Sequence, residues 1–287
     1  MAARSASAAS PETARDPVAA DLERVLTSYD TCYVWRYGSP SSGLRELYAK
    51  AKCDQWDGAS NLDWSISVDP EEPLLPAEIN PLRDYGPYKK MNAREQMRVR
   101  HCQVAWQLSQ FMHGEQGALI VASQLVSAVP MMDAKLYAAS QTMDEARHVE
   151  VFSRYLTEKI EWEWPVNQNL KRLLDTIIQD SRWDLKYLGM QILVAGLVIE
   201  ACELMRDRLI GEETADYFGL EREPYKQCML DSPILQLFRM QLFARIVPNL
   251  RRLGLLSPRV RSAFDRLGIL QFEDADPTAQ DAALGLA

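Results

Sequence analysis

The sequence predicts an all-α protein, a helical bundle with a helical extension at its N-terminal end and further helices at its C-terminal end. Two long stretches of helical periodicity, separated only by Pro130, dominate the middle of the chain. No stretch alternates apolar and polar residues as a half-buried strand does, and no repeat of about 20 to 50 residues is present. Because long helices joined by short loops pack as antiparallel neighbours, the predicted architecture is a bundle.

The N-terminal part of the chain is expected to be less regular. Residues 1–20 are rich in Ala and Ser and lack the continuous apolar core of a signal peptide, which predicts a disordered tail. Residues 21–91 are expected to form short helices near 21–29 and 42–54, followed by an irregular crossing segment. That segment is rich in Pro, Gly, Asn and Asp, the residues that favour turns and interrupt helices.

The main helical domain is predicted over residues 92–267. The sequence NAREQ at its start places Asn92 as an N-cap with Glu95 three residues later, which is a capping-box pattern. Residues 268–287 follow as an acidic, Ala-rich tail. Within the domain, helices are expected at about 92–129, 131–160, 168–180, 183–210, 233–253 and 257–267, with short helices and turns between 211 and 232.

Composition and charge narrow the class of protein. The formal net charge is −8, and Lys and Arg are dispersed, which is unlike the basic stripe of a nucleic-acid binder. The most apolar run, YLGMQILVAGLVI, is shorter than the roughly 20 residues that span a bilayer. The cysteines form no CxxC pair, so a disulfide framework is not expected and a cytoplasmic location is predicted. The five cysteines are Cys32, Cys53, Cys102, Cys202 and Cys228.

Glu115 has an unusual position within the first long helix. At about 100° per residue it is the lone acid on a stripe of apolar side chains along one face of that helix. These are Met97, Val104, Leu108, Phe111, Leu119, Ala122 and Val126. A carboxylate on such a face is costly unless it is neutralised or paired. The alternatives are a surface glutamate or an ion pair with an arginine of a neighbouring helix.

Glu145 and His148 belong to the sequence DEARH and lie three residues apart, so both project from one face of the second long helix. The turn centred near residue 130 is equidistant from residues 115 and 145. Antiparallel packing therefore brings Glu115 level with Glu145 and His148. Carboxylate and imidazole donors in this combination suit iron or manganese, and a bridging glutamate suits a dinuclear site.

Glu115, a spacer of twenty-eight residues and then DEARH resemble the signature of ferritin-like carboxylate-bridged di-iron proteins. That superfamily includes ribonucleotide reductase small subunits, bacterial multicomponent monooxygenases and related oxidases and oxygenases. The resemblance covers about residues 92–205 and implies a ferritin-like domain with a di-iron or Mn/Fe centre. It implies Glu115, Glu145 and His148 as metal ligands. It also implies that Asp144 and Arg147 support them, one of the two holding the ligand imidazole by its N–H.

The sequence departs from this family in the second half of the site. The family carries another Glu and a second ExxH, whereas no second ExxH is present here. His101 lies about 21 Å along the helix axis from Glu115, and His113 points to the opposite side, so both are predicted to be packing or surface residues. Glu200 is the better candidate for a further ligand, with a surface role as the alternative.

Three functions are compatible with these features. The resemblance predicts a non-haem di-iron or Mn/Fe oxidoreductase that activates O₂ on an unknown small substrate. The alternatives are a degenerate ferritin-like metal-binding or scaffold protein without turnover, and a plain helical protein whose DEARH forms hydrogen bonds without metal. Metal binding could join two half-sites across the two-fold axis of a homodimer. The alternative, which we favour, is a weak site of one ion per chain with Glu200 as a further ligand.

Overall fold

The computed structural model describes residues 22–38, 41–190 and 211–276. These residues form helices connected by turns and irregular segments, without a β-strand among them, so the all-α prediction is confirmed. The helical elements are α2 (Ser42–Cys53), η1 (Ala77–Ile79), α3 (Gly86–Lys90), α4 (Ala93–Ala128), α5 (Met132–Tyr155), η2 (Leu156–Ile160), α6 (Gln168–Gln179), α7 (Trp183–Tyr187), α9 (Glu212–Tyr217), α10 (Arg222–Asp231), α11 (Pro233–Arg252), α12 (Pro258–Arg266) and η4 (Leu270–Phe272).

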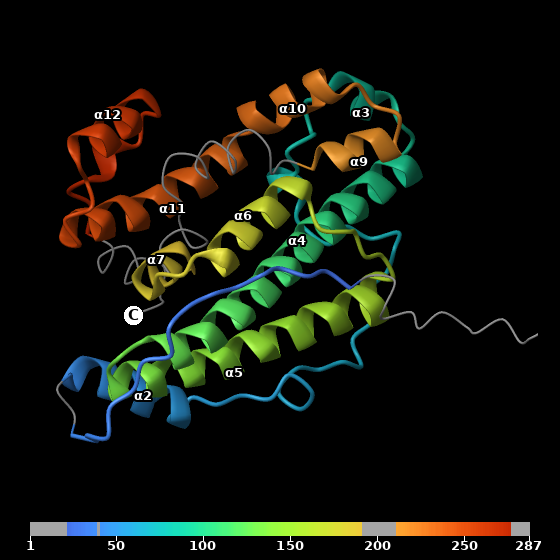
Figure 1. Cartoon of the computed structure of the whole chain (residues 1–287). Helices are drawn as coiled ribbons and strands as arrows, with labels where there is room; N and C mark the ends of the chain where they lie inside the picture. Colours follow the sequence, from blue (N-terminus) through green and yellow to red (C-terminus); the bar gives the residue numbers. More distant parts are fainter. Residues whose placement is uncertain (1–21, 39–40, 191–210, 277–287) are drawn as a thin grey trace, which may run out of the picture.

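Helices α4 and α5 form the long antiparallel pair at the centre of the fold (Figure 1). The predicted capping box starts α4, because Glu95 N–H donates to Asn92 Oδ1 at 3.0 Å and Asn92 N–H donates to Glu95 Oε2 at 2.9 Å. Helix α5 continues into the π-helical turn η2 and ends at Glu161, whose φ of 55° is left-handed. The helix predicted near 131–160 thus becomes an α-helix with a wider last turn.

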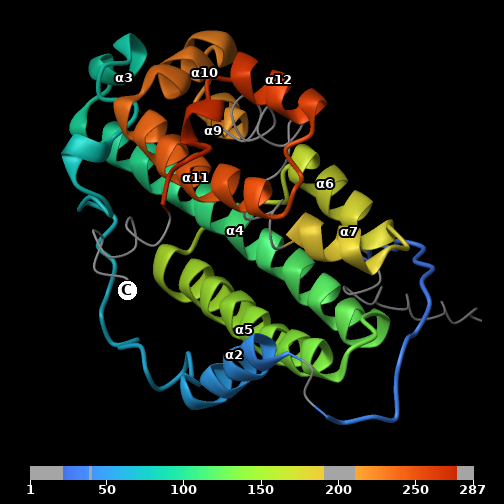
Figure 2. The ribbon, with the colours of Figure 1, turned by 90° about the vertical axis from the view of Figure 1, so that its left-hand side faces the viewer.

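Shorter helices pack against each member of this pair. Helices α6, α7 and α9 pack against α4, and α2 packs against α5 (Figure 2). A core cluster joins α4 to α6 and to the turn after α7 through Val121, Leu125, Leu174, Ile177 and Met190. Two further clusters lie around Tyr88, Val99 and Tyr225, and between α11 and α12.

Gly117 explains how closely α6 approaches α4. A Cβ atom built at Gly117 would lie only 2.5 Å from Leu174 Cδ2, so the leucine packs in the space that a side chain would occupy. Lys186, a residue of α7, holds the C-terminal end of α6 in place. Its fully buried ammonium donates to the carbonyl oxygens of Ile177 at 3.2 Å and Ile178 at 2.6 Å, and to Gln124 Oε1 at 2.6 Å. These bonds satisfy carbonyls that the helix end leaves free.

Two of the predicted helices, near 21–29 and at 183–210, lie at the edges of the described ranges. The helix expected near 21–29 is absent from residues 22–29, which follow an irregular path with Leu26 90 % exposed. Short isolated helices are marginal in water, and this segment is attached instead by the Cys32 N–H, which donates to the carbonyl oxygen of Ser127 at 3.0 Å. The helix predicted at 183–210 begins at Trp183, and its part beyond residue 190 lies outside the described residues.

No helix in the described ranges is both long and apolar enough to cross a membrane.

Candidate metal centre

Helices α4 and α5 bring together the three predicted metal ligands that lie within the described residues. Glu115 lies on α4, and Glu145 and His148 lie one helical turn apart on α5. Because the turn around Pro130 is short, the two helices run antiparallel with these residues at the same level. One potential ligand atom from each residue lies within 4.8 Å of the other two. The convergence predicted from the sequence is therefore confirmed, and the group could hold a metal ion.

The imidazole of His148 faces both carboxylates. Its Nδ1 is 3.1 Å from Glu145 Oε2 and 3.4 Å from Glu115 Oε2. The exposed fraction of the side chain is 12 % for Glu145, 28 % for Glu115 and 39 % for His148, so the imidazole is the most accessible of the three. Ligand atoms bound about 2.1 Å from one ion lie no more than about 4.2 Å apart, so the three side chains would have to move closer together to bind one ion.

The charges of the three groups are strongly coupled. Hydrogen bonds to Glu115 and Glu145 raise the pKa of His148 to about 9. Burial raises the pKa of Glu115, and the neighbouring Glu145 acts in the same direction. Burial also opposes ionisation of Glu145, but hydrogen bonds from His148 and Glu115 outweigh it and lower the pKa of that carboxyl. Two acidic groups thus share one imidazole proton, and a metal cation that displaces this proton would find three donor atoms directed at it.

Polar and aromatic neighbours surround the group. Gln141 Nε2 donates to Glu145 Oε1 at 3.3 Å, which leaves Oε2 directed toward His148. Phe111 and Phe152 form an aromatic pair one turn beyond Glu115 and His148, with ring centroids 6.2 Å apart. The donor set, two carboxylates and one imidazole, is of the kind that iron and manganese accept, so the residues fit such an ion.

The structure gives Asp144 and Arg147 a different role from the one that the resemblance implies. Arg147 donates through Nη2 to Asp144 Oδ1, and through Nη1 to Gln55 Oε1 at 2.8 Å and the carbonyl oxygen of Trp56 at 2.9 Å. In the part of the chain that the structure describes, neither side chain holds the imidazole of His148. Each precedes a ligand by one residue and so lies about 100° around the helix from it.

Trp56 contacts the imidazole instead. Its ring is stacked against that of His148, with centroids 6.1 Å apart and planes at 28°. Sequence reasoning missed this residue, because Trp56 precedes His148 by 92 positions and lies in a segment without helical periodicity. Gln141 had a signal, since it shares the inward face of the second long helix with Glu145.

The other candidates from the sequence do not join the group. His101 Nε2 lies 2.7 Å from the carbonyl oxygen of Glu72, and His113 Nε2 lies 2.9 Å from that of Trp164. Both imidazoles therefore bind backbone, which agrees with the packing role predicted for them. Glu200 lies outside the described residues, so its role as a further ligand stays a prediction.

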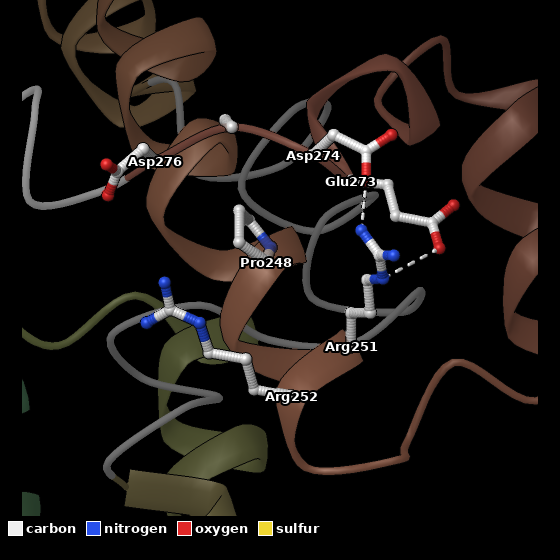
Figure 3. Close-up of a pocket in the computed structure, with 7 residues that line it drawn as sticks. Pro248, Arg251, Arg252, Glu273, Asp274 and Asp276 are labelled. Carbon is white, nitrogen blue, oxygen red and sulfur yellow. Dashed lines mark hydrogen bonds and ion pairs between the residues drawn. The ribbon is translucent and has the colours of Figure 1, made fainter.

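A separate hollow of about 370 Å³ lies at the surface between α11 and the segment after η4 (Figure 3). Arg251 is paired with Asp274 and lies 3.5 Å from Glu273, so its positive charge is already shared by two carboxylates. The lining residues are Pro248, Arg251, Arg252, Glu273, Asp274, Ala275 and Asp276. None of the three predicted metal ligands lines this hollow.

Comparison with known proteins adds no further assignment. No protein-family model, curated protein or solved structure matches the chain. Inference about function therefore depends on the geometry of Glu115, Glu145 and His148 and on the motif that contains them.

Proposed function

We propose that this chain is a ferritin-like metalloprotein in which Glu115, Glu145 and His148 bind iron or manganese. We further propose that it is an oxidoreductase that activates O₂ on a small organic substrate. The observation that carries the proposal is the convergence of three donor atoms within 4.8 Å from two helices. The motif adds chemical direction, because Glu115 and DEARH resemble the ligand set of carboxylate-bridged di-iron proteins.

The residues of the chain suggest how each would act. When bound, iron or manganese would supply the electrons that reduce O₂. Glu115 and Glu145 would balance the charge of the cation, and Gln141 would keep one oxygen of Glu145 occupied. His148 would provide a nitrogen ligand through Nδ1 after loss of its proton. The exposed part of its imidazole gives small molecules access to this side of the group.

A second candidate is a ferritin-like metal-binding or scaffold protein without turnover. The observation that favours it is the single ExxH of the sequence, which supplies half the ligands that a complete di-iron centre takes from four helices. Both candidates require a metal at the same three residues, and they differ in whether the bound metal reacts with O₂.

Metal content tests the proposal directly. Protein produced in iron-supplemented medium is analysed for iron and manganese beside Glu145→Ala, with Glu150→Ala as the matched control. Glu150 is an exposed glutamate on the same helix and lies outside the group. We expect metal in the wild type and the control and its loss in Glu145→Ala. About two ions per chain indicate a dinuclear centre and about one indicates a single-ion site.

The result that refutes metal binding is a wild-type metal content no higher than that of Glu145→Ala. Turnover is tested on the loaded protein by following O₂ consumption with a reductant. Consumption that disappears in Glu145→Ala supports the oxidoreductase, whereas a metal-loaded protein that consumes no O₂ supports the second candidate.

A further inference from the structure

Residues 55–64 form an irregular segment that follows α2 and lies beside α5. Gly58 is buried there, and a Cβ atom at this position would lie 2.5 Å from Val151 Cγ2 on α5. Only a glycine allows the backbone to lie so close to that valine. The contact places the residues around Gly58 directly against the helix that carries Glu145 and His148.

Contacts with α5 hold this segment at both of its ends. At the first, Arg147 donates to Gln55 Oε1 and to the carbonyl oxygen of Trp56, and its guanidinium lies 5.3 Å from the centre of the Trp56 ring. At the second, Trp64 Nε1 donates within the segment to the carbonyl oxygen of Gly58 at 2.6 Å. Arg154 of α5 lies over the Trp64 ring at 4.2 Å. The segment is therefore seated on α5 by specific contacts.

Trp56 is thereby fixed against an imidazole that the two carboxylates contact only through Nδ1. His148 is 39 % exposed, and a rotation of about 180° about χ2 would exchange the positions of its ring atoms and turn Nδ1 away from the carboxylates. The stacked indole occupies one side of the imidazole. Arg147 thus contacts both the backbone and the ring of the tryptophan that lies against His148, and both Arg147 and His148 belong to DEARH.

We propose that Trp56 is a positioning residue of the metal centre, whose indole holds the imidazole of His148 with Nδ1 directed at Glu115 and Glu145. This inference rests on the proposed metal-binding function and assigns Trp56 to it. Residues that orient a metal ligand without touching the ion commonly change metal affinity by about 10- to 100-fold when they are replaced. Trp56 satisfies this description because its ring is stacked on the imidazole of His148. Arg147 contacts Trp56, and Asp144 contacts Arg147, so both act on the imidazole only through Trp56.

The test measures Co(II) binding to purified full-length protein by calorimetry and by its visible absorption spectrum. We expect Trp56→Leu to weaken Co(II) binding about 10-fold and to alter the spectrum, because the imidazole is no longer held in one orientation. Trp56→Phe keeps an aromatic ring and is expected to restore most of the affinity. Trp35→Leu is the matched control, since Trp35 is 78 % exposed and its ring lies against Tyr33. Circular dichroism verifies that each variant is folded.

A second readout needs no metal. The chain has three histidines, so the imidazole protons of His148 are identified in NMR spectra by their loss in His148→Gln. Ring currents of the stacked indole shift these protons, and we expect Trp56→Leu to remove the shift. Unchanged His148 signals in Trp56→Leu, or Co(II) affinity within about twofold of wild type, would overturn the inference. If wild type does not bind Co(II), the proposed metal-binding function is overturned, and the positioning role of Trp56 falls with it.

Discussion

Metal binding at this centre should depend steeply on pH, because the metal must displace the proton on Nδ1 of His148. Hydrogen bonds to Glu115 and Glu145 raise the pKa of His148 to about 9. At pH 7 only about 1 % of the imidazole is then neutral, which lowers the apparent metal affinity about 100-fold below its value at high pH. We expect the affinity to rise about 10-fold per pH unit between about pH 6 and 8 and to level off above about pH 9.

Calorimetry with Mn(II) measures this dependence. Titrations at several pH values, each in two buffers with different ionisation enthalpies, give the affinity and the number of protons released. We expect release of about one proton per Mn(II) near pH 7. His148→Gln is the control, because an amide has no titrating proton, and its weaker binding should lack the steep rise. A wild-type affinity that stays constant from about pH 6 to 8 would refute proton–metal competition at His148.

Deprotonation of His148 favours metal binding, but it lowers the free energy of unfolding of the metal-free protein. The folded-state pKa of His148 lies above the unfolded value of 6.5, so its contacts contribute fully below pH 6.5 and are lost as the pH rises through about 9. A rise of the His148 pKa from 6.5 to about 9 sets a ceiling of about 3 kcal/mol. Because His148 is 39 % exposed, solvent screening reduces the expected contribution to about 1 kcal/mol. Urea denaturation should show this decrease in the free energy of unfolding in wild type and its absence in His148→Gln.

Three other results are expected. Asp144→Ala should weaken Mn(II) binding about 10-fold in calorimetry without loss of helical content, because it frees the arginine that holds Trp56; unchanged affinity would show that Asp144 has no influence on the centre. Gly117→Ala should lower the free energy of unfolding by about 1–3 kcal/mol in urea titrations, since its Cβ would meet Leu174. Its control, Gly114→Ala, has open space and should raise stability by up to about 1 kcal/mol, so equal effects of the two would contradict the packing argument. Sedimentation equilibrium with and without Fe(II) should show a metal-bound monomer, and an Fe(II)-dependent dimer would instead indicate a site shared across a two-fold axis.

The convergence of Glu115, Glu145 and His148 followed from the sequence, because it depends on local geometry. A helix repeats every 3.6 residues, and a short turn at Pro130 fixes the register of the two helices that flank it. The start of α4 was predictable for the same reason, since the capping box involves only Asn92 and Glu95. These features are determined by residues that are close in the chain or related through one turn.

The partners of Arg147 and the stacking of Trp56 on His148 were decided by the tertiary structure. Both contacts join residues more than 90 positions apart, 147 with 55 and 148 with 56. They depend on where an irregular segment is held on α5. The irregular path of residues 22–29 also follows from long-range contacts, because Tyr29 lies against Lys186 and Cys32 binds the end of α4. Helical periodicity specifies a face and a register, whereas the position of a segment without periodicity depends on the surface that the other helices provide.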